Sequence, residues 1–245
     1  MKRIATTVFA FGLMAASFIS CDPATLEGIM SGTGTTTTKV PLTNEEVIRG
    51  LKEALNVGAK NAVSFTSKAD GFNKNNLIRI PFPEEAQKVK NAAINLGLSS
   101  QVETFETTLN RAAEKAAAEA VPVFVNAITS MSIQDGFYIL RGDSTAATTF
   151  LRNSTTAELK QKFSPIVQKA IDEVKLTSYW EPLTKAYNQS TIFTGNQPVN
   201  TDLNAYVTDK ALSGLFYYVA SEEKKIRKDP AARVTDILKR VFGNN

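Results

Sequence analysis

Apolar side chains recur at three- and four-residue steps from Leu42 onward, the spacing that gathers them on one face of an α-helix. The first such run contains Val47, Ile48, Leu51, Leu55, Ala59, Ala62 and Val63. Thr43 stands just before this run and Glu46 follows three residues later, a spacing typical of a capping box at a helix N-terminus. The pattern therefore predicts a helix that begins at Thr43 and extends through Val63.

Similar patterns predict helices along nearly all of the remaining chain. The expected helix starts lie near Pro83, Ser100, Ser132, Asp143 or Ser144, Thr155, Tyr179, Asp202 and Asp229. Two of these starts, Ser100 and Thr155, have an acid three residues later and predict capping boxes. Pro122 should kink or break the long helix that follows Ser100, because proline lacks an N–H group and clashes with the preceding turn. No convincing pair of alternating strands occurs, so we expect an all-α fold, a single bundle-like domain of roughly eight to ten helices.

The segment Asp70–Pro83 departs from the helical pattern and is the best candidate for a functional surface. It is long for a connection between helices, and binding residues concentrate in such loops. We take Asp70, Asn75 and Arg79 as its candidate binding residues. The alternative is structural: Asp70 and Asn75 would satisfy backbone groups, and Arg79 would pair with a helix carboxylate.

The first twenty residues have the parts of a signal peptide: two basic residues, an apolar run and a short stretch of small residues. Cys21, the single cysteine, follows directly, at the position where a bacterial lipoprotein is acylated. The alternatives are an ordinary secretory signal that leaves a free thiol, or a cleaved helix anchor, although the apolar run is shorter than the about 20 residues that span a membrane. We expect lipid attachment at Cys21 and a periplasm-facing protein anchored in the bacterial cell envelope.

The expected mature chain divides into a tether and a folded body. Residues 21–41 are rich in Gly and Thr and predict a flexible tether, while residues 42–245 should form the all-α domain. Removing residues 1–20 takes away two of the 28 basic residues and none of the 24 acidic ones, so the net charge falls from +4 to +2. The remaining charges are interspersed rather than gathered on one basic face, so we expect no nucleic-acid partner.

The chain contains no histidine, which removes the commonest general base and the usual zinc ligand. No serine–lysine spacing suited to acyl chemistry is present, and no isolated pair of acids stands out. We therefore expect no catalytic residue, no cofactor and no metal. The alternative is a histidine-free hydrolase that acts on an envelope polymer through paired carboxylates. The aromatic run 216–218, with Tyr179, Trp180 and Tyr187, is typical of a helical core but could also line a ligand site.

Three stretches of the chain resemble a known bacterial family. They lie within residues 51–86, 109–135 and 211–233, and include Ile80-Pro81-Phe82-Pro83, Ser132-Ile133-Gln134-Asp135 and Pro230-Ala231-Ala232-Arg233. Together they resemble the family called domain of unknown function 4197, over roughly residues 42–243. The resemblance implies a small exported protein, often a lipoprotein. The family has no established activity, so it implies no catalytic residue.

These observations lead to one expectation and one alternative. We expect a membrane-tethered lipoprotein that serves as a non-catalytic binding or envelope-structural module, held by acylated Cys21 and contacting an envelope protein or ligand. The alternative is the carboxylate hydrolase. A cleft with two carboxylates within about 10 Å of each other would favour the hydrolase.

Overall fold

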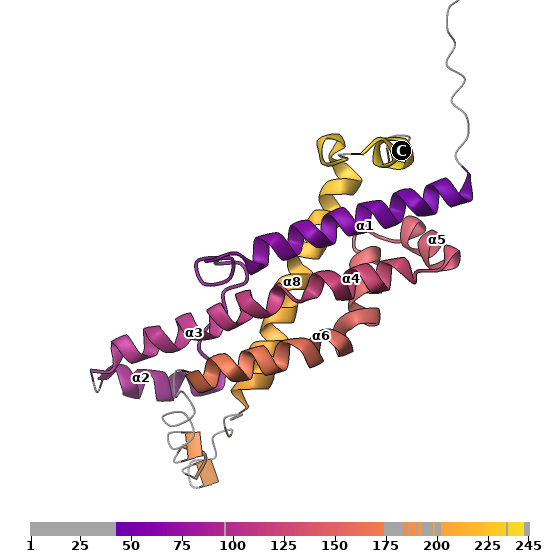
Figure 1. Ribbon diagram of the computed structural model, residues 1–245. Helices are drawn as coiled ribbons and strands as arrows, with labels where there is room; N and C mark the ends of the chain where they lie inside the picture. The colour runs from indigo at the N-terminus through magenta and orange to yellow at the C-terminus, as the bar shows by residue number, and fades with distance from the viewer. Residues whose placement is uncertain are drawn as a thin grey trace, which may run out of the picture. The chain divides into compact units, whose positions relative to one another are not determined.

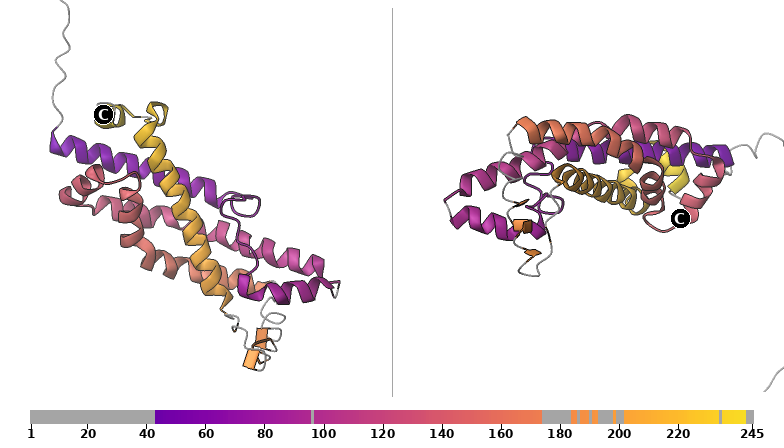
Figure 2. Two further views of the ribbon diagram at one scale, coloured as in Figure 1. Left: turned by 180° about the vertical axis from the view of Figure 1, so that it is seen from behind. Right: turned by 90° about the horizontal axis from the view of Figure 1, so that it is seen from below.

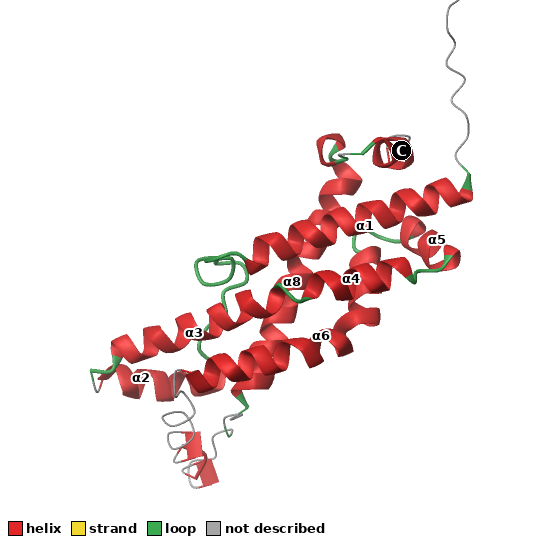
Figure 3. Ribbon diagram, viewed as in Figure 1, coloured by secondary structure: helices red, strands yellow, loops and turns green. Residues whose placement is uncertain are grey.

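The arrangement of the chain was determined as a computed structural model, which describes residues 43–95, 97–173, 202–233 and 235–242, together with residues 184–185, 187–189, 191–192 and 198. These residues form eight α-helices and two 3₁₀ turns and contain no β-strand, which confirms the expected all-α fold and helix number (Figure 3). The leader, Cys21 and the tether lie outside the described residues, as do Tyr179 and Trp180.

In chain order the helices are α1 (Asn44–Ser67), α2 (Gln87–Asn95), α3 (Ser99–Ala117), α4 (Ala120–Thr129), α5 (Ile133–Arg141), α6 (Ala146–Glu173), α8 (Leu203–Lys228) and α9 (Asp236–Phe242). Short connections join α2 through α6, whereas a longer segment follows α1, and residues 174–202, most of which lie outside the described residues, separate α6 from α8. One 3₁₀ turn, Glu84–Ala86, leads into α2, and another, Pro230–Ala232, lies between α8 and α9.

Several helix ends form as the sequence predicts, because they depend on neighbouring residues alone. At Thr43 both hydrogen bonds of the capping box are present: the Glu46 N–H donates to the Thr43 hydroxyl over 3.1 Å, and the Thr43 N–H donates to the Glu46 carboxylate over 3.0 Å. Ser132 and Asp135 form the same reciprocal pair at the start of α5. Pro122 lies at the third position of α4, where a helix needs no N–H donor, and the chain breaks between α3 and α4 just before it.

Two predicted capping boxes are wrong. The α3 helix begins at Ser99, one residue before the predicted cap at Ser100, and Leu98 occupies the cap position without a side-chain bond. The paired bonds that end α2, from the Gly97 N–H to Ile94 and from the Leu98 N–H to Ala93, lead the chain directly into α3. Thr155 lies inside α6 and donates its hydroxyl to the Leu151 carbonyl over 2.6 Å, so residues 146–173 are one helix instead of two.

The described residues of the unit Leu42–Asn245 are compact, and α8 packs against most of the long helices. Figure 1 shows α1, the α3–α4 pair and α6 side by side, with α8 crossing behind them. The view from behind in Figure 2 shows the same crossing from the other side. Small side chains permit this close packing, because Ala112, Ala113, Ala116 and Ala117 of α3 are all fully buried.

The contact between α8 and the segment after α1 requires a glycine. A Cβ atom at Gly214 would lie 2.6 Å from the Phe72 ring and 3.1 Å from the Ile78 Cβ. Phe72 is fully buried and Ile78 nearly so, and neither has room to move away. Gly214 therefore allows the segment between α1 and α2 to lie directly on α8.

Candidate functional site

The predicted functional segment, Asp70–Pro83, folds as a series of turns on the surface formed by α3 and α8. It starts at Asp70, whose φ of 63° is a left-handed conformation that aspartate tolerates better than most residues. Three polar residues of α3, spaced four apart, then hold the segment: Glu106, Asn110 and Glu114. All three are buried, so the segment is attached to the core of the domain along its length.

Glu114 binds the beginning of the segment. Its Oε1 accepts the backbone N–H groups of Phe72 and Asn73, each over 3.1 Å. Its Oε2 accepts a 2.7 Å bond from Arg111, which also donates to Asp70 over 2.6 Å. The bond with Glu114 is the largest factor that raises the pKa of Arg111. Asp70 is thus part of an ionic chain within the domain.

Asn110 binds the middle of the segment and is fully buried. Its amide pairs with both backbone groups of Ile80, accepting from the N–H and donating to the carbonyl, each over 2.8 Å. The same Nδ2 group also donates to the Glu106 carbonyl over 2.7 Å. Both backbone groups of Ile80 thus have the Asn110 side chain as their hydrogen-bond partner. The amide takes the place that a neighbouring β-strand would have at this one residue.

Glu106 binds the end of the segment through an ion pair with Arg79 over 2.7 Å, and it also pairs with Lys90 of α2 over 2.6 Å. Burial alone would raise the pKa of Glu106, but the hydrogen bonds from Lys90 and Arg79 outweigh it and hold the pKa below its usual value. The carboxylate is therefore ionised at neutral pH. Arg79 has the helix-carboxylate partner that the structural alternative requires.

Asn75, the third candidate residue, connects the segment to α8. Its Nδ2 donates to the Gly71 carbonyl over 3.0 Å and to the Tyr218 hydroxyl over 2.8 Å, and its Oδ1 accepts the Leu77 N–H over 3.1 Å. The structure thus brings Asp70, Asn75 and Arg79 to one segment, but it gives each of them partners inside the domain. Their contribution to binding a partner stays a prediction.

An exposed group of aromatic rings lies beside this segment. The rings of Phe65 and Tyr218 are stacked with centroids 4.3 Å apart, and Tyr217 meets Tyr218 edge-on at 5.5 Å. Asn75 connects Leu77 to this group, since it accepts the Leu77 backbone N–H and donates to the Tyr218 hydroxyl. Leu77 is 66% exposed, Tyr217 47% and Phe65 39%. We call Phe65, Leu77, Tyr217 and Tyr218 the aromatic face.

The sequence prediction named Tyr217 and Tyr218 as core or ligand-lining residues, whereas it missed Phe65 and Leu77. It also missed the buried polar residues of α3. A signal for these was present, because Glu106, Asn110 and Glu114 recur every four residues beside an alanine-rich apolar stripe. The same register is typical of the solvated face of an amphipathic helix, so the spacing by itself does not show that these residues are buried under the irregular segment before α2.

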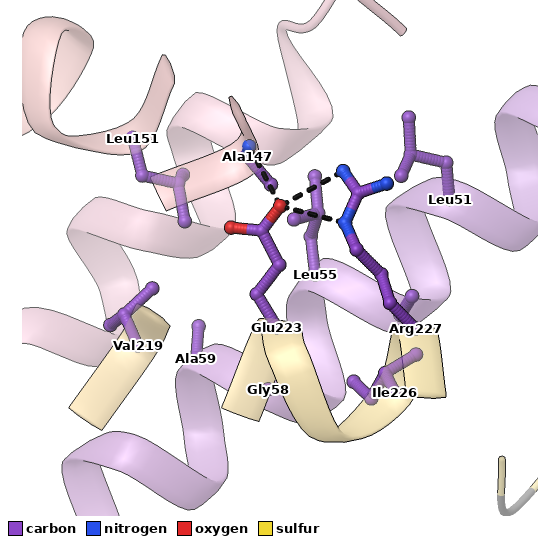
Figure 4. A pocket seen from close by; sticks show the side chains of 11 residues that line it. Leu51, Leu55, Gly58, Ala59, Ala147, Leu151, Val219, Glu223, Ile226 and Arg227 are labelled. Atoms are coloured by element: carbon purple, nitrogen blue, oxygen red, sulfur yellow. Dashed lines mark hydrogen bonds and ion pairs between the residues drawn. The ribbon is translucent and has the colours of Figure 1, made fainter. Parts of the chain in front are cut away.

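A third buried acid, Glu223 of α8, caps α6 from a distance (Figure 4). It accepts the N–H groups of Ala147 and Thr148 over 3.1 and 2.9 Å, and it pairs with Arg227 over 2.9 Å. Arg227 in turn donates to the Ile139 carbonyl at the end of α5. The apolar cavity beside Glu223 measures about 30 Å³, which has room for one water molecule and none for an organic ligand.

Elsewhere in the described residues, an open depression of about 410 Å³ lies between Lys115 of α3 and the stretch of α6 around Pro165. Among the residues that the structure describes, no group of three or more metal-ligating side chains comes together. In that same part of the chain no single helix has the length and apolar character to cross a membrane; the segments 99–129 and 133–141 meet those criteria as a pair but are bent by 105°.

Comparison with known proteins identifies a family. The model of the family described as "Protein of unknown function (DUF4197)" matches residues 41–243, so the chain belongs to that family and the expected resemblance is confirmed. No curated protein and no solved structure matches the chain.

Proposed function

We propose that this member of the DUF4197 family is a lipoprotein of the bacterial envelope, tethered through acylated Cys21, whose folded domain binds a partner protein without catalysing a reaction. The observation that carries the proposal is the aromatic face. Tyrosine and other aromatic residues are enriched at protein interfaces, where they bury a large area at a low cost in side-chain entropy. A cluster of partly exposed rings on a rigid support is typical of such a surface.

The support beneath the aromatic face favours binding. The segment 70–83 is held at Phe72, Ile80 and Arg79 by buried residues of α3. Leu77 projects from this fixed segment, and Tyr217 and Tyr218 project from α8, which packs against most of the long helices of the domain. A surface that is already ordered loses less conformational entropy on association than a free loop does.

The position of the aromatic face also agrees with a tethered protein. Phe65 lies in the last turn of α1, and the tether would enter at Thr43, before the first turn. At about 1.5 Å per residue, these two ends of α1 are roughly 30 Å apart. The first residue of the folded domain and the aromatic face thus lie at opposite ends of α1.

The buried acids of the described residues have structural partners, which supports a non-catalytic role. Glu106, Glu114 and Glu223 each accept bonds from basic side chains or from backbone N–H groups. The carboxylate hydrolase remains the alternative. Turnover of an envelope polymer by the purified chain, abolished by a single Asp or Glu substitution, would favour it over the binding role.

Site-specific photocrosslinking in intact cells tests the binding role. A photoreactive amino acid would replace Leu77 or Tyr217, and a matched control would carry it at Gln161, an exposed position of α6. We expect a discrete crosslinked product at the two test positions and none at the control. Equal crosslinking at all three positions, or none at Leu77 and Tyr217, would contradict the proposal.

A further inference from the structure

The short helix α5 lies against the first turns of α1. A Cβ atom at Gly136 would come within 2.3 Å of the Ile48 side chain, so this glycine lets α5 make direct contact with α1. Both views show α5 beside the beginning of α1 (Figures 1 and 2). The helix therefore lies at the end of the domain where α1 begins.

The outward face of α5 combines apolar and basic residues. Ile133 is 52% and Tyr138 70% exposed, and Phe137 is partly buried beneath the guanidinium of Arg141, 5.6 Å from its ring centroid. At 100° per residue, the arc from Ile133 through Phe137 and Arg141 to Tyr138 covers about 140° of the helix. The helix buries Gly136 and Ile139 on the other side.

The acidic residues of α5 and its two ends, Asp135 and Asp143, lie outside this arc. Asp135, the acid within α5, accepts hydrogen bonds from Ser132 at the helix cap, and the bond with the Ser132 side chain is the main cause of its lowered pKa. Asp143, two residues after Arg141, accepts bonds from Thr145 and lies in the field of Arg227 and Lys224. The arc thus presents Ile133, Gln134, Phe137, Tyr138 and Arg141 and contains no acidic residue.

We propose that the outer face of α5 rests in the headgroup region of an anionic lipid bilayer. Helices that lie at this boundary bury an apolar face and place basic residues among the headgroups, and tyrosine is enriched at this depth. An arc of this size binds lipid weakly by itself. The inference therefore rests on the proposed acylation of Cys21.

Because the chain between Cys21 and α1 is short, even a weak contact between α5 and lipid is enough to keep α5 at the membrane. Cys21 and Thr43 are 22 positions apart, so at about 3.3–3.6 Å per residue the folded domain stays within roughly 75 Å of an anchored Cys21. Such tethering gives a high effective concentration of lipid at α5.

A single-cysteine label tests the contact. The full mature lipoprotein, in which lipid occupies the thiol of Cys21, would carry Tyr138→Cys labelled with an environment-sensitive fluorophore. The control would be Gln161→Cys on α6. Both would be reconstituted into vesicles of phosphatidylethanolamine and phosphatidylglycerol, in which a fraction of the lipids carries a quencher in the acyl chain.

We expect blue-shifted emission and strong lipid quenching at position 138 and neither at position 161. Adding Arg141→Gln should lower the docked-to-undocked ratio about fivefold on anionic vesicles and leave it unchanged on neutral ones. Equal quenching at both positions, in protein that remains vesicle-bound, overturns the inference and leaves the anchor intact. A shift that depends on protein density instead of lipid composition assigns the face to a second copy and also overturns it. Protein that stays out of the vesicle fraction overturns both the anchor and the contact.

Discussion

Replacing Asn110 with alanine should undo the attachment of the segment 70–83 to the core. The substitution removes both hydrogen-bond partners of Ile80, whose side chain is 1% exposed. A buried polar group left without a partner costs about 1–3 kcal/mol, so the two backbone groups together cost about 2–6 kcal/mol. The loss of packing around a fully buried side chain adds to this figure.

The free energy of unfolding of the variant and the parent can be compared by urea denaturation followed by circular dichroism. Domains of this kind are stable by about 5–15 kcal/mol, so the expected loss is a large fraction of the total. For a domain of roughly 200 residues, a loss of about 4 kcal/mol corresponds to a Tm about 8–16 °C lower. Amide hydrogen exchange at Phe72 and Ile80 would show whether the segment opens by itself before the domain unfolds.

Asn153→Ala provides the matched control, because Asn153 is an exposed asparagine inside α6. Its effect should stay within about 0.5 kcal/mol. If the two variants unfold at the same urea concentration and exchange their amides alike, the buried amide of Asn110 does not hold the segment. The argument for a rigid support beneath the aromatic face would then fail.

Three further predictions concern the anchor, the core and pH. Cys21→Ser should release the protein from the membrane fraction, and a variant that resists a high-salt wash would contradict acylation at this residue. Gly214→Ala should lower the stability by about 1–3 kcal/mol, measured by urea denaturation, because its Cβ would press on the Phe72 ring 2.6 Å away. The pKa of Glu106 and that of Asp70 are lowered in the folded state, so stability should be full above their unfolded pKa values near 4 and fall as the pH drops through the folded ones. The chain has no histidine, so urea midpoints should stay level between pH 6 and 8, and Glu106→Gln should flatten the decline in acid.

The sequence predicted the features that depend on neighbouring residues. The all-α class follows from periodicity, and the predicted capping box at Thr43 and the predicted helix start at Ser132 depend on groups three residues apart. Thr155 has the same local pattern, yet it lies within a continuous helix. The reason is tertiary, since α6 starts earlier and Glu223, 75 residues further along, binds its first turn. A distant carboxylate replaces the local cap, and no local pattern reveals that.

The candidate site was located by the sequence, whereas the roles of its residues were not. The irregular character of residues 70–83 identified a segment unlike the other connections. Loop composition alone could not show that Arg79 faces Glu106, because the pairing depends on how α3 lies beneath the segment. Exposure of Leu77 likewise depends on which neighbour, here Ile78, contacts Gly214. Two adjacent apolar residues give no indication of which one points inward.

The kind of partner that the segment 70–83 can bind depends on which of its side chains are not already paired within the domain. Because Asp70, Asn75 and Arg79 have partners within the domain, the groups left for a partner are mainly the rings and Leu77, with Lys68 and Lys74 exposed nearby. Apolar contact would then supply most of the affinity, while the lysines at the edge would mainly affect the association rate. Binding should therefore be slowed by salt but weakened most by loss of a ring. A partner whose affinity depended on Arg79 more than on Tyr217 would contradict this division.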